Sequence, residues 1–307
     1  MVPLKIDLPE HFLDEEIRCG YTITKHMKEI WAIELDLLSE LQRVFEKYNI
    51  PYFAYAGTVL GAVRHNGFIP WDDDIDLIVN RENFEKLCKV AKKEFESPYF
   101  FQTEETDTGC CIGLAKLRNS DTTMILRNHE NRNFRFNQGI FIDIFVYDNV
   151  PENEIERNLF FKEIDELKSK SLKFRNTFHC DKTELNTVKG QIKNFLEKMI
   201  NLFNIRNPYY YKLSSLCQKY NNITTKIVAD CFSFPVACKI LDKNSYEESI
   251  YMPFEFLKLP VPKNYDEHLT MFFGDWRTPM RIAPKHGLDA ITNTSESYKF
   301  FFRKNKK

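Results

Sequence analysis

The pattern of apolar and polar positions predicts a long amphipathic helix near the start of the chain. Between residues 25 and 48, apolar side chains recur at the three- and four-residue spacing of one helix face, and charged residues fill the positions between them. Asn49 and Pro51 follow, and both favour the end of a helix. We therefore expect a helix that packs one apolar face onto the rest of the protein.

Short apolar runs predict strands that belong to one sheet. The runs occupy residues 52–55, 75–79, 99–102, 112–117, 123–126 and 140–146. The last run is apolar except for Asp143, which indicates a central strand. Helical spacing at 59–65, and from Asn80 to about residue 95, places two helices among these strands. The fold class that follows is α+β, with a mixed β-sheet flanked by helices.

Beyond Pro151 the pattern changes and becomes mainly helical. Helical spacing covers 152–173, 188–204 and 209–220, and a short strand-like stretch covers 227–232. We expect this region to form a helical insertion or second subdomain. The division that we predict is an N-terminal arm at 1–24, a core at 25–150, a helical region at 151–225, a C-terminal part that completes the core domain at 226–290, and a basic aromatic tail at 291–307.

Composition and charge narrow the class of protein. The 307 residues are 43% hydrophobic and 28% charged, as in an ordinary globular protein. The 43 Lys and Arg residues are balanced by 44 Asp and Glu residues, which leaves a net charge of -1. Binding to a nucleic-acid polymer needs a basic surface that neutralises phosphates, so we exclude a nucleic-acid polymer as partner.

The cysteines and the N-terminus predict a cytoplasmic location. The eight cysteines contain no CxxC pair and do not have the spacing of a zinc site, which favours free thiols in a reducing compartment. The first residues lack the apolar segment of a signal peptide. No window approaches the roughly 18 uninterrupted apolar residues of a membrane span.

Four aspartates between residues 72 and 76 are the first indication of chemistry. Residues two apart on a strand share a face, so we expect Asp74 and Asp76 to point the same way while Ile75 enters the core. Two carboxylates so close repel each other, and a bound divalent cation removes that cost. Hard oxygen ligands favour Mg²⁺ or Mn²⁺. Asp72 lies on the loop before the strand and is a further candidate ligand. We expect Asp73 to be part of an acidic loop and not a ligand.

Asp143 is the second indication, because a lone carboxylate in a buried strand is costly unless it is paired or bound to metal. If its strand lies beside residues 75–79, Asp143 completes a triad with Asp74 and Asp76. One member of the triad can then deprotonate an attacking hydroxyl while the others hold metal. The alternative is a buried aspartate that caps a neighbouring backbone.

Glycine and basic residues supply candidate contacts to an anion. Gly57 and Thr58 stand at a strand-to-helix turn, where backbone N–H groups and the positive end of the helix approach a phosphate. Arg64 in that helix, and Lys116 and Arg118 on a later strand, are candidates to hold phosphate oxygens. For Lys116 and Arg118 the alternative is a pair of edge-strand charges.

Together these pieces resemble the nucleotidyltransferase superfamily, in which a small mixed sheet holds a three-carboxylate metal site against a nucleoside phosphate. More closely, four segments look like the signature of the LicD family, which includes bacterial phosphocholine transferases and is related to fukutin and fukutin-related protein. The segments are YAGTVLGAVRHNGFIPWDDDIDLIV, LAKLRNSDTTMI, NQGIFIDIFVYDNVP and LPVPKNYDEHLTMFFGDW. The resemblance extends from about residue 33 to residue 287. It implies a nucleotidyltransferase-like fold, in which the family's acidic cluster corresponds to Asp72, Asp74 and Asp76, with Asp143 as the later acid.

The resemblance also implies a reaction, the transfer of a phospho-alcohol from a CDP-alcohol donor to a hydroxyl of a glycan or lipid-linked glycan acceptor. CMP leaves, and a metal bridges the diphosphate. In this reaction Asp74 and Asp76 are metal ligands, and Asp143 is a ligand or the general base. Thr58 and Arg64 contact phosphate. CDP-choline is the donor that we expect, and the alternatives are donors of ribitol, glycerol or ethanolamine phosphate, or transfer of the nucleotide moiety itself.

A quaternary ammonium group such as choline binds to aromatic faces, and three aromatic residues near the motifs are candidates. They are Trp71, Tyr99 and Trp276. The N-terminal arm and the helical region carry no motif of the family, and we expect them to determine acceptor specificity.

Other classes of protein use similar acids. A glycosyltransferase also combines an Asp-x-Asp motif with metal and a nucleotide, but it normally places a nucleotide-binding βαβ unit before the motif. The aspartates also fit the first positions of an EF-hand calcium loop, but Leu77 stands where that loop needs glycine and Asn83 where it needs glutamate. An inactive scaffold is disfavoured because every acid of the triad is present. An enzyme is therefore the favoured class.

In the C-terminal tail, three consecutive phenylalanines, 300–302, are followed by four basic residues, Arg303, Lys304, Lys306 and Lys307. Basic residues are attracted to an anionic leaflet, so peripheral contact with the inner face of the plasma membrane is one reading of the tail. A solvated tail is the alternative.

Overall fold

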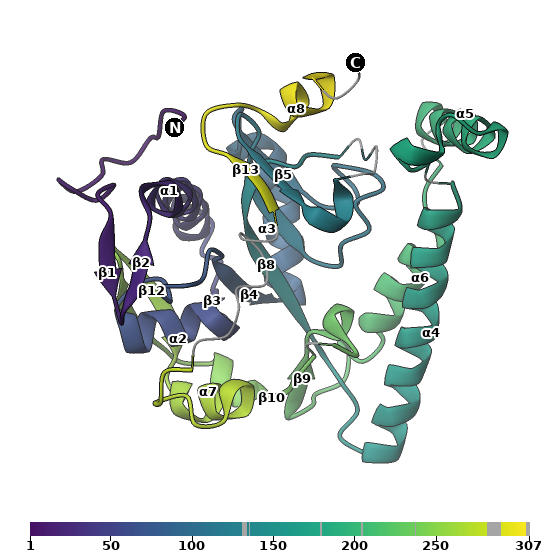
Figure 1. The fold of residues 1–307 in the computed structure, drawn as a ribbon. Coiled ribbons are helices and arrows are strands. Elements are labelled where there is room, and N and C mark those ends of the chain that lie inside the picture. Colours follow the sequence, from purple (N-terminus) through teal and green to yellow (C-terminus); the bar gives the residue numbers. More distant parts are fainter. Residues whose placement is uncertain are drawn as a thin grey trace.

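The structure is a computed structural model, and it describes residues 1–130, 134, 136–178, 180–203, 205–236, 238–280 and 290–304. A mixed sheet lies at its centre (Figure 1). Its strands follow the order β10-β9-β8-β4-β3, while β6 pairs with β8 and carries β5. They are β3 (Phe53–Ala54), β4 (Asp76–Asn80), β5 (Tyr99–Gln102), β6 (Ala115–Asn119), β8 (Ile140–Asn149), β9 (Ile227–Ala229) and β10 (Ile240–Asp242). β8 pairs with β4, β6 and β9, which confirms the central strand that the apolar run predicted.

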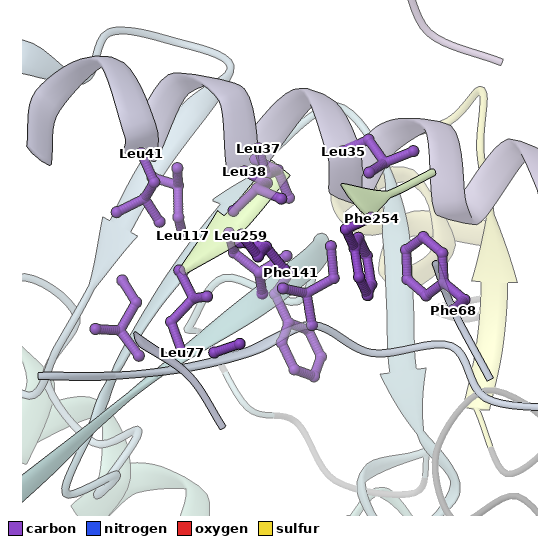
Figure 2. Packing of buried hydrophobic residues seen from close by; sticks show 14 of the residues in the cluster. Leu35, Leu37, Leu38, Leu41, Phe68, Leu77, Leu117, Phe141, Phe254 and Leu259 are labelled. Carbon is purple, nitrogen blue, oxygen red and sulfur yellow. The ribbon is translucent and has the colours of Figure 1, made fainter. Parts of the chain in front are cut away.

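One face of the sheet is covered by α1 (Lys25–Lys47), the predicted amphipathic helix. Thr24 caps this helix, because its Oγ1 accepts a hydrogen bond from the Met27 N–H at 3.3 Å. Figure 2 shows Leu38 and Leu41 pointing from α1 toward the strands, where Leu117 lies. The helix α3 (Arg81–Glu94) adds Leu87 and Ala91 to the same cluster. This face is therefore the main hydrophobic core of the protein.

The opposite face of the sheet carries a smaller hydrophobic cluster, to which strands from the second half of the chain contribute. Ile78 of β4 and Tyr147 of β8 pack there with Val228 of β9 and Leu241 of β10. Beyond this cluster, α4 (Glu154–Phe178) packs against α6 (Pro208–Cys217) around a second buried cluster. The third helix of the region, α5 (Val188–Leu202), sits at the far end of α4 (Figure 1). The three helices predicted beyond Pro151 are confirmed.

Several boundaries differ from the predicted ones. The helix expected at 59–65 is α2 (Ala56–His65), so Gly57 and Thr58 lie in its first turn. The strand expected at 112–117 begins at Ala115, and β8 continues to Asn149. The chain adopts a left-handed turn at Ala56 with φ of 42°, and this turn lets the helix begin directly after β3.

The N-terminal arm and the C-terminal part contain hairpins that the sequence pattern did not predict. β1 (Glu16–Arg18) pairs with β2 (Tyr21–Ile23), and β11 (Ser249–Phe254) pairs with β12 (Leu257–Pro262). Arg18 joins the two hairpins, because its guanidinium donates to both carboxylate oxygens of Glu255 at 2.6 and 2.9 Å. The arm is therefore docked on the body of the protein.

The C-terminal elements also dock on the body. β13 (Ala290–Asn293) pairs with β7 (Thr123–Leu126), and α8 (Tyr298–Lys304) follows. The Tyr298 N–H donates to the Thr122 carbonyl at 2.9 Å, and the Tyr298 side chain is buried. The basic residues Lys306 and Lys307 of the predicted tail lie outside the described residues. All eight cysteines are free thiols, as predicted. Over the part of the chain that the structure describes, no helix has both the length and the apolar character of a membrane span.

Candidate active site

Asp76 and Asp143 lie side by side on neighbouring parallel strands. They are register partners in the pairing of β4 with β8, and the Asp143 N–H donates to the Ile75 carbonyl at 2.9 Å. Residues in register on adjacent strands project to the same face, so the two carboxylates share one face of the sheet. Leu77 and Ile144, one residue further along each strand, are register partners within the main core.

The loop before β4 brings two more carboxylates to the same region. Asp72 and Asp74 line a cavity together with Asp76. The loop is fixed from behind by α1, because the Trp31 Nε1–H donates to the Asp72 carbonyl at 2.9 Å. Gly57 lies against this loop, and a Cβ atom at its position would be 3.3 Å from the Asp72 Oδ2. A glycine at this position therefore lets the start of α2 approach the acidic loop closely.

Burial and mutual repulsion hold protons on two of these acids. Burial, together with repulsion from the neighbouring Asp74 and Asp73, raises the pKa of Asp72 to about 8. Burial likewise raises the pKa of Asp76 well above its usual range, with Asp74 and Asp143 acting in the same direction. The site therefore brings carboxyl groups together in a place where ionising all of them is unfavourable, because water cannot screen their repulsion.

Lys116 is held directly against Asp143. The two are register partners of β6 and β8, and the Lys116 Nζ lies 2.5 Å from the Asp143 Oδ1. The same ammonium lies 3.6 Å from the centre of the Phe141 ring. Burial lowers the pKa of Lys116, while the charge of Asp143 opposes that change. Lys116 is thus placed at the acids, as a cation that neutralises one of them.

The other predicted phosphate contacts occupy different positions. Arg64 and Gly57 line the cavity, and the Arg64 Nη1–H donates to the Trp276 carbonyl at 2.7 Å. Thr58 is buried, and its Oγ1 accepts a hydrogen bond from the Asp76 N–H at 2.7 Å, so it positions the strand that carries Asp76.

Arg118 lies inside the protein and not on the cavity wall. Its Nε–H donates to the Gln102 Oε1 at 2.6 Å, and its Nη1–H donates to the Gly139 carbonyl at 2.7 Å. Its side chain is 6% exposed. We correct the expectation for Arg118 on this ground, because its donors are used by the fold; it holds β5 and the start of β8 to β6. The edge-strand alternative is also wrong for Lys116 and Arg118, because β6 lies between β5 and β8.

The cavity has a volume of about 760 Å³. The acids and Arg64 form one part of its wall, and aromatic side chains form much of the rest. The aromatic lining consists of Tyr55, Trp71, Phe145, Phe272, Phe273 and Trp276. Trp71 and Trp276, which were predicted as candidates to bind a quaternary ammonium group, therefore lie on the cavity wall. Tyr99 does not, because it is buried in the main core and its hydroxyl donates to the Asp36 Oδ2 at 2.6 Å.

Comparison with known proteins agrees with this geometry. Residues 49–184 match the family model described as LicD/FKTN/FKRP, nucleotidyltransferase domain. The chain is 27% identical over 264 residues to the lipopolysaccharide cholinephosphotransferase LicD of Haemophilus influenzae, an alignment that covers 84% of this chain and 93% of that protein. Residues 49–184 therefore form a LicD-family nucleotidyltransferase domain. An uncharacterised protein of Rickettsia prowazekii is 28% identical over 117 residues, which is 38% of this chain and 40% of that protein.

The acids of this LicD-family site have the chemistry that a hard divalent cation requires. Across the described ranges, no three acidic, histidine or cysteine side chains form a ready shell around one point. However, Asp72, Asp74 and Asp76 line one wall, and burial near like charges raises the pKa of two of them. A divalent cation relieves such repulsion. The ion pair between Lys116 and Asp143 would have to open for Asp143 to join the ligands.

Sequence reasoning missed most of the cavity wall that faces the acids. Phe272 and Phe273 end α7 (Tyr265–Phe273), and Lys239 and Asp275 line the cavity near them. These residues follow the acidic loop by more than 150 positions, so local patterns do not place them there. The one available signal was the segment MFFGDW, which the LicD resemblance had already included.

Proposed function

We propose that the protein transfers phosphocholine from CDP-choline to a hydroxyl of a glycan, releases CMP, and depends on Mg²⁺ or Mn²⁺. The proposal is supported chiefly by one observation, the placement of Asp74 and Asp76 on the cavity wall with Asp143 in register beside Asp76. The LicD-family domain makes the chain a phosphotransferase. The name of the Haemophilus influenzae relative supports choline as the alcohol and a lipopolysaccharide as the kind of acceptor.

In this proposal Asp74 and Asp76 hold the metal, and Asp72 is the further ligand at the edge of the loop. When bound, a divalent cation would neutralise negative charge on the donor diphosphate and on the departing CMP. The protein contributes a rigid mount for these acids. Thr58 fixes the start of β4 through the Asp76 N–H, and Trp31 fixes the loop through the Asp72 carbonyl.

Asp143 is the base that we propose for the acceptor hydroxyl. The acceptor oxygen forms a bond to the phosphorus that carries choline, and the bond from that phosphorus to the oxygen of CMP breaks. The hydroxyl proton moves to the Asp143 carboxylate. Lys116, which lies 2.5 Å from the Asp143 Oδ1, is then the group that is released to meet a phosphate oxygen.

The start of α2 and Arg64 are the phosphate contacts that the cavity offers. The first turn of α2 places Gly57 at the wall, next to the positive end of the helix dipole. Arg64 is held at the same wall by its hydrogen bond to the Trp276 carbonyl. Both therefore orient the diphosphate between the acids and α7.

The aromatic lining supports choline over an alcohol with several hydroxyls. A quaternary ammonium has no hydrogen-bond donors, and it binds to the faces of aromatic rings. Trp71, Phe272 and Phe273 supply such rings on the cavity wall. Trp276 is less available, because the Arg277 guanidinium lies 4.4 Å from the centre of its ring. A ribitol phosphate donor would instead need polar partners for each of its hydroxyls.

The direct test is to incubate the full-length chain with Mg²⁺ and each of CDP-choline, CDP-ethanolamine, CDP-glycerol and CDP-ribitol, and to measure CMP release with and without a glycan acceptor. We expect the highest kcat/KM for CDP-choline and an increase in CMP release when acceptor is present. CTP is the matched control for transfer of the nucleotide moiety. Release of pyrophosphate from CTP, with no CMP from any CDP-alcohol, would contradict the proposal.

A further inference from the structure

The helix α5 presents an apolar face to solvent. The exposed fractions are 76% for Val188, 56% for Ile192, 60% for Phe195 and 73% for Leu202. None of the hydrophobic clusters formed by the described residues includes a side chain of α5. Monomeric proteins leave single apolar residues exposed, but a continuous set on one helix marks an interaction surface.

The exposed apolar residues of α5 form one stripe with basic borders. At about 100° per residue, Val188, Ile192, Phe195 and Leu202 fall within a sector of roughly 120°, the width of an amphipathic face. Lys189 and Lys198 fall on its two opposite borders, and both are exposed. We refer to these four apolar residues as the α5 stripe.

The back of α5 anchors the helix so that the α5 stripe faces outward. Gly190 is buried, and a Cβ atom at its position would lie 1.8 Å from the Glu184 carbonyl oxygen, so the helix packs closely on the short 3-10 turn at Lys182–Glu184. The Lys193 Nζ lies 2.8 Å from a Glu184 carboxylate oxygen on the same side. The other main contacts of α5 are with α4. Figure 1 shows α5 at the end of α4 that is distant from the sheet.

We propose that α5 docks on the surface of an anionic bilayer, with the α5 stripe in the interfacial region and Lys189 and Lys198 at the lipid headgroups. A helix with one apolar face and lysines along its borders lies in the plane of the interface, and anionic lipids strengthen its binding. The charge of this segment is complementary to such a surface. Residues 182–206 carry five basic and two acidic side chains, although the whole chain has a net charge of -1.

A second copy of the chain is a poorer fit to the same face. If two α5 helices paired around a two-fold axis, the lysine borders of one stripe would meet those of the other, and like charges in register oppose association. A bilayer offers both an apolar interior and negative headgroups. The inference stands on the exposed helix and its charges, and it does not depend on which alcohol is transferred.

The test measures flotation of the full-length chain with vesicles of phosphatidylethanolamine and phosphatidylglycerol, and with vesicles of phosphatidylcholine alone. We expect the chain to float with the anionic vesicles, and the bound fraction to fall as salt is raised. The double variant Ile192→Glu and Phe195→Glu should weaken this binding by roughly tenfold or more. The matched control, Asn186→Glu and Asn194→Glu, adds the same charge to the same segment outside the α5 stripe and its lysine borders, and should bind within a factor of about three of the unchanged chain.

Three results would overturn the inference. The first is failure of the unchanged chain to bind anionic vesicles, and the second is equal binding by the stripe variant and the control. The third is a dimer in sedimentation that only the stripe variant dissociates. Release of CMP from CDP-choline in detergent solution is measured on every variant. Because the main contacts of α5 are with α4 and the 3-10 turn, and not with the strands β4 and β8, both variants should retain that activity, which separates a failure of membrane docking from a failure of the proposed reaction.

Discussion

The two faces of the central sheet are built from alternating residues of the same strands, and they carry opposite chemistry. On β4 and β8, Leu77 and Ile144 are completely buried in the main core. One residue away on each strand, Asp76 and Asp143 are register partners beside the acidic loop. The apolar side chains of the main core stabilise the fold, whereas the carboxylates on the other face oppose it, because buried carboxylates repel each other. Substitutions on the two faces should therefore have opposite effects on stability and activity.

The largest effect is expected from Asp76→Asn on the charged face. This change removes a ligand and its charge while keeping the shape of the side chain, so kcat should fall by about a thousandfold or more. The free energy of unfolding should stay the same or increase, because one source of repulsion is lost. CMP release and urea denaturation measure the two quantities. Asp121→Asn, which changes an exposed aspartate in a turn, is the control and should alter neither.

The second prediction concerns Ile144→Ala on the apolar face. Ile144 is completely buried and lies in register with Leu77 and Ala115, so its truncation leaves a cavity in the main core. We expect the free energy of unfolding to fall by about 3 kcal/mol. The kcat of the protein that remains folded should change by less than about threefold, because the acids keep their places. A loss of kcat as large as that of Asp76→Asn would break the comparison between the faces.

The third prediction concerns His268, a buried residue of α7 behind the aromatic wall. Burial lowers the pKa of His268 from 6.5 to about 4, and its ring stacks on Phe272. Between pH 6.5 and about 4 the unfolded chain binds a proton that the folded chain does not, so stability is lost as the pH falls through this window. In His268→Phe this part of the loss, up to roughly 3 kcal/mol, should disappear. Urea denaturation of both proteins at the two ends of the window measures the difference; equal losses would contradict the prediction.

The smallest effect is expected from Phe273→Leu on the aromatic wall. Phe273 lines the cavity and is only partly buried, so the change should be tolerated by the fold. Loss of one aromatic face should raise the KM for CDP-choline by about tenfold. The KM for CDP-glycerol should change less, because that donor carries no cation. Equal changes for both donors would indicate that Phe273 contacts a part that they share, and not the alcohol.

The sequence was sufficient for those features that depend on local alternation. The apolar run around Asp143 identified the central strand, and the acidic segment placed Asp74 and Asp76 at one cavity, although Asp74 lies on the loop and not on β4 as the alternation had predicted. The neighbourhood of Asp76 and Asp143 followed from that run together with a parallel pairing. The strands themselves could be predicted because each is encoded within a few consecutive residues, whereas the pairing of β4 with β8 is seen only in the fold.

Features that depend on distant packing could not be predicted in the same way. Arg118 shares a strand face with Lys116, but its guanidinium donates hydrogen bonds to the Gln102 side chain of β5 and to the Gly139 carbonyl. Thr58 was assigned to phosphate, but its hydroxyl accepts the Asp76 N–H. In each case the partner comes from an element whose position is set by the whole fold. The aromatic wall from α7 is the same kind of feature.

The central claim is that buried acids repel one another until a divalent cation joins them, and thermal unfolding tests it most directly. Without metal, burial and neighbouring acids raise the pKa of Asp72 to about 8. The folded chain then keeps a proton that the unfolded chain, with its ordinary pKa of 3.8, releases, so stability is lost as the pH rises from about 4 to about 8. Mg²⁺ should therefore raise the Tm markedly near pH 8 and much less near pH 5, and it should not do so in Asp76→Asn. A Tm that Mg²⁺ leaves unchanged near pH 8, or that it raises equally in Asp76→Asn, would contradict the account.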